Sequence, residues 1–87
     1  MEIKKVKVAD PNGLHMRRAA SVVELSKRYK SKIYLCHKCR FANTCSILQL
    51  LTLAATKDAE IAVIAEGPDE KEAINGITQV FINGAGI

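Results

Sequence analysis

The sequence predicts an α+β fold, an open-faced sandwich in which helices cover one face of a four-stranded sheet, in the order β-α-β-β-α-β-α. Segments with the two-residue period of strands alternate with segments of helical period, and turn signals separate them. The chain has 87 residues, enough for one small core and too few for two. We therefore expect a single domain over residues 1–87, whose few helices lie on one face of the sheet.

The first predicted strand runs from Ile3 to Val8, where apolar Val6 and Val8 alternate with lysines. It ends at Asp10-Pro11-Asn12-Gly13, because proline fixes φ while asparagine and glycine tolerate positive φ. A helix is predicted over roughly residues 16 to 28. Ala19, Val22, Val23 and Ser26 fall at helical spacing and form its predicted stripe, and its C-terminal end is basic, with Lys27, Arg28, Lys30 and Lys32.

Two further strands and a short helix are predicted in the middle of the chain. Ile33–His37 and Arg40–Asn43 are the strands, joined by a tight turn near Lys38-Cys39. Ser46-Ile47-Leu48-Gln49 has the pattern of a capping box, in which the serine caps a helix and Gln49 reaches back to it. This helix is expected to continue to about Leu53.

The last strand and helix follow a clear break. Glu60–Ala65 is rich in strand-forming residues and ends before Gly67-Pro68. Asp69-Glu70-Lys71-Glu72 places acids in the first turn of the final helix, which is expected to end at Asn83–Gly86. Its apolar stripe consists of Ala73, Ile74, Ile77, Val80 and Phe81.

The charge of the chain is unevenly distributed and favours acidic or phosphorylated partners. The net charge is +4, but residues 1–40 hold eleven Lys/Arg and three Asp/Glu, whereas residues 41–87 hold two and six. Nucleic acid is disfavoured, since dense basic runs and interleaved aromatic residues are absent from the sequence. The N-terminus has no apolar core typical of a signal peptide, and Ile47–Ala55 is too short to span a bilayer. We expect a cytoplasmic protein without membrane insertion.

The stretch Gly13-Leu14-His15-Met16-Arg17-Arg18 is the candidate functional site. A helix N-terminus presents unpaired N–H groups that hold anions, and neutral imidazole is a competent nucleophile. Arg17 can pair with phosphate oxygens, and Arg18 adds positive potential. These features indicate a reversible phosphohistidine. The alternative is that His15 only caps the helix, with both arginines as solvated surface charges.

Three motifs resemble the HPr family, the histidine-containing phosphocarriers of the bacterial sugar phosphotransferase system. Gly13-Leu14-His15-x-Arg17 followed by Ala19-Ala20 resembles the family's active-site motif. Ala42-Asn43-x-x-Ser46-Ile47 resembles its second signature, and Ala65-Glu66-Gly67-x-Asp69-Glu70 resembles the start of its last helix. The resemblance covers essentially the whole chain. It implies a four-stranded antiparallel sheet with three helices on one face.

The resemblance also implies a function and its partners. His15 would accept a phosphoryl group at Nδ1 from phosphorylated enzyme I and pass it to the IIA domain of a sugar permease. Arg17 would be the assisting cation, with Asn12 and Met16 beside the site. Such a protein is a carrier rather than an enzyme in the strict sense. We expect no cofactor and a monomer.

Two positions depart from the family pattern. The family usually has proline where this chain has Arg18, and arginine restores a backbone donor and adds a charge, which is expected to retune the transfer rate. It usually has glycine where this chain has Cys39, so we expect a reshaped turn.

Ser46 has a structural and a regulatory interpretation. The structural one is an ordinary helix N-cap. In some bacteria the matching serine is phosphorylated by a dedicated kinase, which turns HPr into a regulator of carbon catabolite control. The implied partners are a serine kinase/phosphorylase and a catabolite-control transcription factor. A diverged HPr-like regulator, acting only by binding through Ser46 and the second helix, is therefore the main alternative to a carrier.

The second helix carries more apolar residues than one buried stripe can use. If Leu50 and Leu53 point inward, then Ile47, Leu48 and Leu51 remain at the surface. An apolar patch beside a basic site is typical of docking surfaces, and the resemblance implies enzyme I and IIA domains as its partners. For Leu51, a position in the core is the alternative.

The three cysteines, an odd number, indicate free thiols, with Cys36 and Cys39 as a pair that could oxidise. Zinc held by Cys36, Cys39, Cys45 and His37 is the alternative. Cys36 and His37 point to opposite faces of a strand, which makes convergence hard. We therefore expect no metal.

Overall fold

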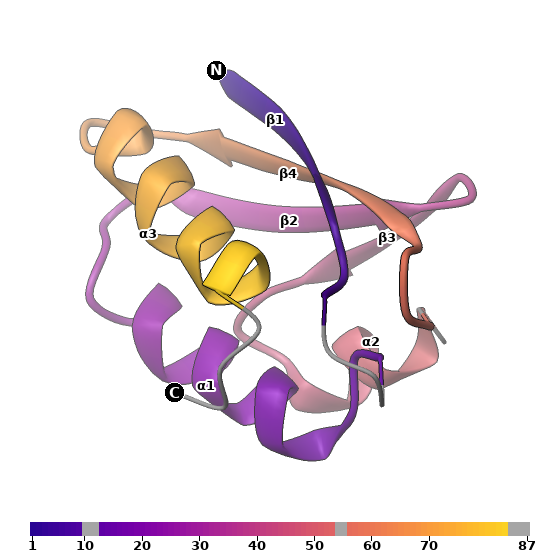
Figure 1. The fold of residues 1–87 in the computed structure, drawn as a ribbon. Helices are drawn as coiled ribbons and strands as arrows, with labels where there is room; N and C mark the ends of the chain where they lie inside the picture. Colours follow the sequence, from indigo (N-terminus) through magenta and orange to yellow (C-terminus); the bar gives the residue numbers. More distant parts are fainter. Residues whose placement is uncertain (10–12, 54–55, 84–87) are drawn as a thin grey trace.

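The sheet has four antiparallel strands, in the predicted element order. The computed structural model describes residues 1–9, 13–53 and 56–83. The strands are adjacent in the order β1-β4-β2-β3 and pair antiparallel (Figure 1). The elements are β1 (Glu2–Lys7), α1 (Met16–Ser26), β2 (Lys32–His37), β3 (Arg40–Asn43), α2 (Ile47–Thr52), β4 (Glu60–Glu66) and α3 (Glu70–Asn83).

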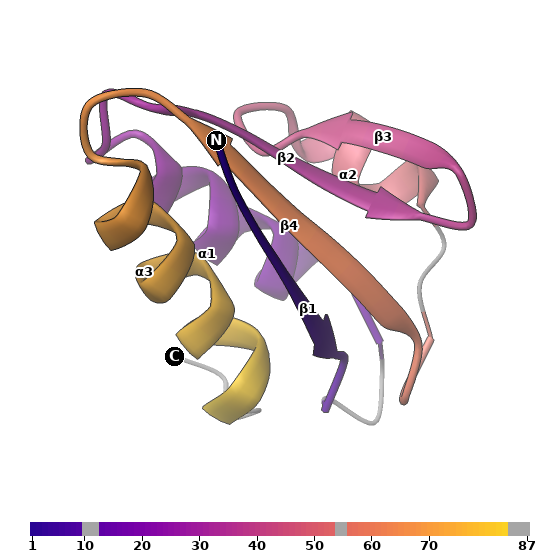
Figure 2. The ribbon, with the colours of Figure 1, turned by 90° about the horizontal axis from the view of Figure 1, so that it is seen from above.

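The three helices lie on one face of the sheet, and the core lies between the two layers (Figure 2). Alternate residues of the central strands β2 and β4 are buried, as the period of a one-sided sheet requires. The predicted stripes of α1 and α3 both face this core, because the residues named for them are all buried. The predicted fold class is therefore confirmed.

The first helix is shorter than predicted. It ends at Ser26, two residues before the expected boundary, and Lys27 is its C-cap. The N–H of Arg28 bonds to the carbonyl of Leu25 and that of Tyr29 to the carbonyl of Ser26, so the chain tightens into i→i+3 turns. The last turn of α1, which is described throughout, contains no basic residue. The basic residues expected there lie in the segment that follows.

The hairpin between β2 and β3 has a two-residue turn. His37 pairs with Arg40, and both central residues have positive φ, 49° for Lys38 and 66° for Cys39. Positive φ at both positions is the requirement of a type I′ turn. Cys39 thus adopts a positive φ that glycine would adopt without steric cost.

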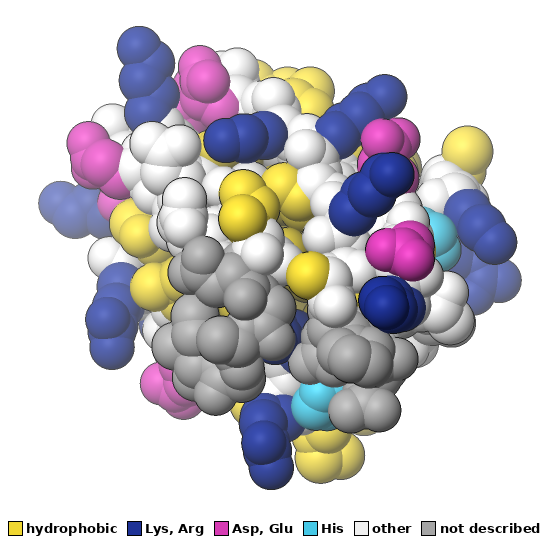
Figure 3. All heavy atoms as spheres, viewed as in Figure 1, with side chains coloured by type: hydrophobic (Ala, Val, Ile, Leu, Met, Phe, Trp, Pro, Cys, Tyr) yellow, Lys and Arg dark blue, Asp and Glu magenta, His cyan; other side chains and the backbone are white. Residues whose placement is uncertain are grey.

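Charged side chains of both signs are present on the face seen in Figure 3. In Figure 3, Lys and Arg side chains stand around the rim of the visible face, with Asp and Glu among them. The excess of positive charge in residues 1–40 therefore does not gather on this face into one continuous basic patch.

Candidate functional site at the start of the first helix

His15 is the N-cap of α1, as predicted. Gly13 has a φ of 71°, which glycine adopts without strain, and Leu14 is buried, so the chain enters the helix at a fixed point. His15 itself is extended, with φ −98° and ψ 179°. Its carbonyl accepts the N–H of Ala19 at 2.9 Å, the first bond of the helix. The imidazole therefore stands at the helix N-terminus, half exposed.

The ring of His15 makes the capping contact through Nδ1. This nitrogen accepts the backbone N–H of Arg17, with 3.3 Å between the two nitrogens. A ring nitrogen that accepts a hydrogen bond carries its lone pair and no proton, so the geometry corresponds to imidazole protonated on Nε2. Nδ1 consequently faces the N-terminal N–H groups, which also favour an anion. The atom that makes the capping contact is thus the one that the predicted phosphohistidine would use.

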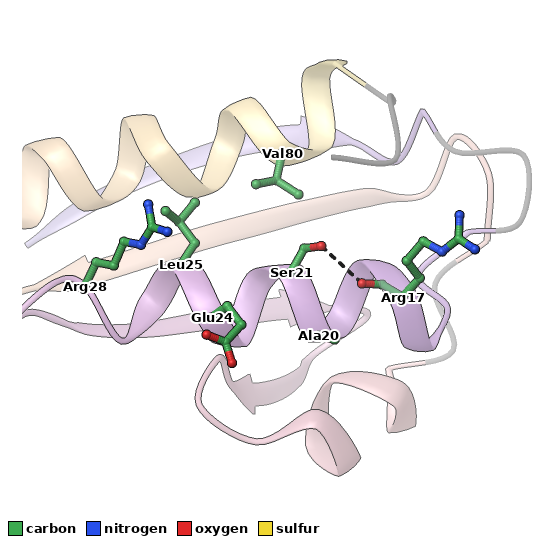
Figure 4. Close-up of a pocket in the computed structure, with 7 residues that line it drawn as sticks. All are labelled: Arg17, Ala20, Ser21, Glu24, Leu25, Arg28 and Val80. Carbon is green, nitrogen blue, oxygen red and sulfur yellow. Dashed lines mark hydrogen bonds between the residues drawn. The ribbon is translucent and has the colours of Figure 1, made fainter.

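The side chain of Arg17 borders a groove that is open to solvent. The Arg17 side chain is exposed, and its carbonyl accepts the Ser21 hydroxyl at 3.2 Å. Arg17 and Arg28 stand at the two ends of a groove of about 440 Å³ between α1 and α3 (Figure 4). The rest of its lining is Ala20, Ser21, Glu24, Leu25 and Val80. The sequence did not reveal this groove, because it needs the packing of two helices distant along the chain.

Arg18 points into the protein and is not a solvated surface charge. Its side chain is 3% exposed, and Nη1 donates to the carbonyl oxygen of Val80 at 2.9 Å. The alternative of two solvated arginines is thus wrong for Arg18. Helical spacing carried a signal, since Arg18 lies four and eight residues before the buried Val22 and Ser26.

Asn12 and Met16 are the other two predicted neighbours of the site. Asn12 lies outside the described residues. Met16 is 66% exposed in the first turn of α1. The second helix contacts α1, so the element that carries Ser46 lies against the element that begins at the histidine.

Ser46 is the N-cap of α2, as predicted, but the capping box is not reciprocal. The Ser46 hydroxyl accepts the N–H of Gln49 at 3.3 Å. Gln49 Oε1, however, accepts the N–H of Asn43 at 2.9 Å, and the N–H of Ser46 donates to the carbonyl of Asn43 at 3.0 Å. The expected return contact from Gln49 to Ser46 is therefore wrong, because a nearby strand residue offers it another donor.

The apolar residues of α2 are divided between core and surface. Leu50 and Leu53 are buried, the condition on which the docking prediction depended. Leu48 is 77% exposed, whereas Ile47 and Leu51 are half buried against the core. A docking surface on α2 would thus be centred on Leu48.

The cysteines do not converge with His37. Cys36 is half buried and Cys39 and Cys45 are exposed, all three as free thiols, whereas His37 is buried and near the carbonyl of Glu60. Within residues 1–9, 13–53 and 56–83, no group of three or more His, Cys, Asp or Glu could hold a metal ion. The same part of the chain contains no helix that is both long and apolar enough to cross a membrane.

The fold and the site together define a class of small α+β sandwich proteins with a histidine at the start of the first helix, and sequence comparison identifies the family. A family model described as "PTS HPr component phosphorylation site" matches residues 3–83. The chain therefore belongs to the HPr family. It is 36% identical over 83 residues to the phosphocarrier protein HPr of Treponema pallidum, covering 95% of this chain and 94% of that protein. It is 34% identical over 78 residues to that of Buchnera aphidicola, covering 90% and 92%.

Solved structures of the same family have the same fold. HPr-C-His from Thermoanaerobacter tengcongensis superposes with a TM-score of 0.93 at 26% identity, covering 100% of this chain and 98% of that one. Crh of Bacillus subtilis, a catabolite repression protein described as a swapped dimer, superposes at 0.78 with 32% identity, covering 97% of both chains. An HPr dimer from T. tengcongensis superposes at 0.75 with 26% identity, covering 95% of both chains. Dimers thus occur among similar structures.

Proposed function

We propose that this protein is a cytoplasmic phosphocarrier of the phosphotransferase system that acts as one HPr-like domain. It accepts a phosphoryl group on Nδ1 of His15 from phosphorylated enzyme I and passes it to IIA domains of sugar permeases. The observation that carries the proposal is the contact of Nδ1 with the N–H of Arg17 at the start of α1. Membership of the HPr family supports it.

The first transfer is a displacement at phosphorus. The lone pair of His15 Nδ1 attacks the phosphoryl group, and the bond from phosphorus to the donor breaks as the new N–P bond forms, leaving its electron pair on the donor. The N–H of Arg17 then donates to a phosphoryl oxygen, and the helix N-terminus stabilises the charge. The exposed guanidinium of Arg17 pairs with another oxygen. Transfer to a IIA domain reverses these steps.

Docking brings the two phosphate sites together. The partner contacts Leu48 and the half-buried Ile47 and Leu51 on α2, while Met16 and Arg17 border the histidine on α1. Such encounters are brief, because the surface is small and charge steering accelerates association. The protein needs no cofactor for this role and works as a monomer.

Incubation with phosphoenolpyruvate and enzyme I tests the carrier function. The wild type is expected to acquire acid-labile label, and His15→Ala to acquire none. Ser46→Asn is the matched control and retains the label, since it keeps a capping group on α2 and leaves the histidine and α1 intact. Absence of label on the wild type with a demonstrably active enzyme I would exclude the carrier function.

Regulation through Ser46 is a second candidate function. Its hydroxyl stands at the start of α2, where a phosphate is stabilised by the helix dipole, and similarity to the catabolite repression protein Crh favours it. A serine kinase/phosphorylase and a catabolite-control transcription factor would be the partners. An ATP-dependent kinase of this class should label the wild type and leave Ser46→Asn, which retains a capping group, unlabelled. Equal labelling of both would exclude Ser46 as the target.

A further inference from the structure

Arg18 joins the first turn of α1 to the last turn of α3. Its guanidinium donates to the carbonyl of Val80, 62 residues further along the chain, at 2.9 Å. Val80 is the fourth residue from the end of α3, so its carbonyl is among those that an α-helix leaves without an intrahelical partner. These carbonyls form the negative end of the helix dipole. A permanent cation therefore meets the negative end of a second helix.

The two adjacent arginines lie in different environments. Arg17 is exposed at the end of the groove, whereas Arg18 is 3% exposed where α1 meets the end of α3. The helices run antiparallel, so the start of α1 lies beside the end of α3 (Figures 1 and 4). Arg18 follows His15 by three residues, which is about 4.5 Å along a helix axis. Because it is buried, solvent screens its charge less than that of Arg17.

We propose that Arg18 is a positioning residue of the phosphoryl-transfer site, which ties the His15 turn to the end of α3 and stabilises phosphorylated His15 with a buried charge. This inference rests on the proposed function for its physiological meaning. Phosphorylation adds negative charge at the start of α1, and a cation fixed in the same turn lowers the free energy of the charged product. Neither an apolar side chain nor a proline ring supplies that charge or a donor to Val80.

Three variants separate charge, geometry and fold. Arg18→Met keeps a long side chain but removes the charge and the donors, whereas Arg18→Lys keeps the charge without the planar fork. Lys30→Met removes an exposed charge elsewhere and serves as the control. Each protein is phosphorylated by phosphoramidate, a small phosphoryl donor that requires no enzyme I. The half-life of phosphohistidine at neutral pH is then measured, together with kcat and KM for transfer from enzyme I and the free energy of unfolding in urea.

Arg18→Met is expected to shorten the phosphohistidine half-life and lower kcat, each on the order of threefold to tenfold, with little change in KM. Arg18→Lys should restore most of the half-life, and Lys30→Met should match the wild type. The proposal is overturned if the phosphohistidine half-life of Arg18→Met equals that of Lys30→Met. It is also overturned if the half-life of Arg18→Lys is as short as that of Arg18→Met, since the bond to Val80 would then be only structural. Failure of enzyme I to label the wild type, with the half-life difference intact, would refute the carrier function and leave this inference standing.

Discussion

The carboxylate of Asp69 binds Ser31 twice, accepting its backbone N–H at 2.9 Å and its hydroxyl at 2.5 Å. The other carboxylate oxygen accepts the N–H of Lys30 at 2.9 Å. Asp69 immediately precedes α3, whose first bond runs from the N–H of Ala73 to the Asp69 carbonyl. One side chain therefore connects the start of the last helix to the loop between α1 and β2.

The connection through Asp69 makes the free energy of unfolding depend on pH in the acid range. The hydrogen bonds from the Ser31 hydroxyl and from the Lys30 backbone lower the pKa of Asp69 below its ordinary value of 3.8. A group with a lowered folded pKa stabilises the fold above its unfolded pKa and loses this effect as pH falls through the folded pKa. Urea unfolding between pH 2 and pH 6 should therefore show a shallower pH dependence in Asp69→Asn than in the wild type. Identical slopes would contradict this role.

Gly67 is expected to tolerate no side chain. It has a φ of 155°, and a Cβ placed there would lie 2.6 Å from the backbone Cα of Ser31. Gly67→Ala should lower the free energy of unfolding by about 1–3 kcal/mol. Gly76→Ala is the control, because the added methyl meets the end of the Tyr29 side chain, which can move, and alanine favours the helix. Equal losses in the two variants would show that the approach to Ser31 is not the cause.

The turn at Cys39 offers a stabilising change. Its φ of 66° costs a residue with a Cβ about 1 kcal/mol relative to glycine. Cys39→Gly should raise the free energy of unfolding by roughly that amount, measured in urea under reducing conditions. Cys39→Ser removes the thiol and keeps the strained φ, so it should change stability little. A gain in Cys39→Ser as large as in Cys39→Gly would assign the effect to the thiol.

Two leucines of α2 should separate stability from docking. Leu50 is fully buried, and Leu50→Ala should cost about 2–5 kcal/mol in urea unfolding. Leu48 is 77% exposed, so Leu48→Ala should change stability by about 0.5 kcal/mol or less. If α2 docks onto enzyme I, Leu48→Ala raises KM for phosphoryl transfer severalfold while the protein stays folded. An unchanged KM would remove Leu48 from the docking surface.

Features that depend on residues close in the sequence were predictable. The stripe of α3 follows from apolar spacing, and the cap at Ser46 follows from its residue type. The cap at His15 follows from its place between a turn signal and a helical pattern. The resemblance then added the antiparallel pairing and the expected phosphoryl donor and acceptors of the histidine. Local pattern and family motif together were therefore enough for the fold and for the location of the candidate site.

Features that depend on distant partners were not predictable. Arg18 is buried because α3 brings the carbonyl of Val80 to it, and Gln49 turns from Ser46 to Asn43 because a strand end lies within reach. The end of α1 was placed two residues too late, since the i→i+3 bonds that close it leave no clear sequence signal. In each case the deciding contact depends on tertiary packing rather than on the periodicity of the sequence.

The strand order has a consequence for the protein at high concentration. β1 and β3 are the outer strands of the sheet, and their unpaired backbone groups could accept a strand from another molecule. β3 has only four residues, which limits pairing along that side. β1 carries the exposed Lys4, Lys5 and Lys7, so a second copy added there would bring lysines against lysines. Both edges of the sheet therefore carry features that oppose its growth into fibrillar aggregates.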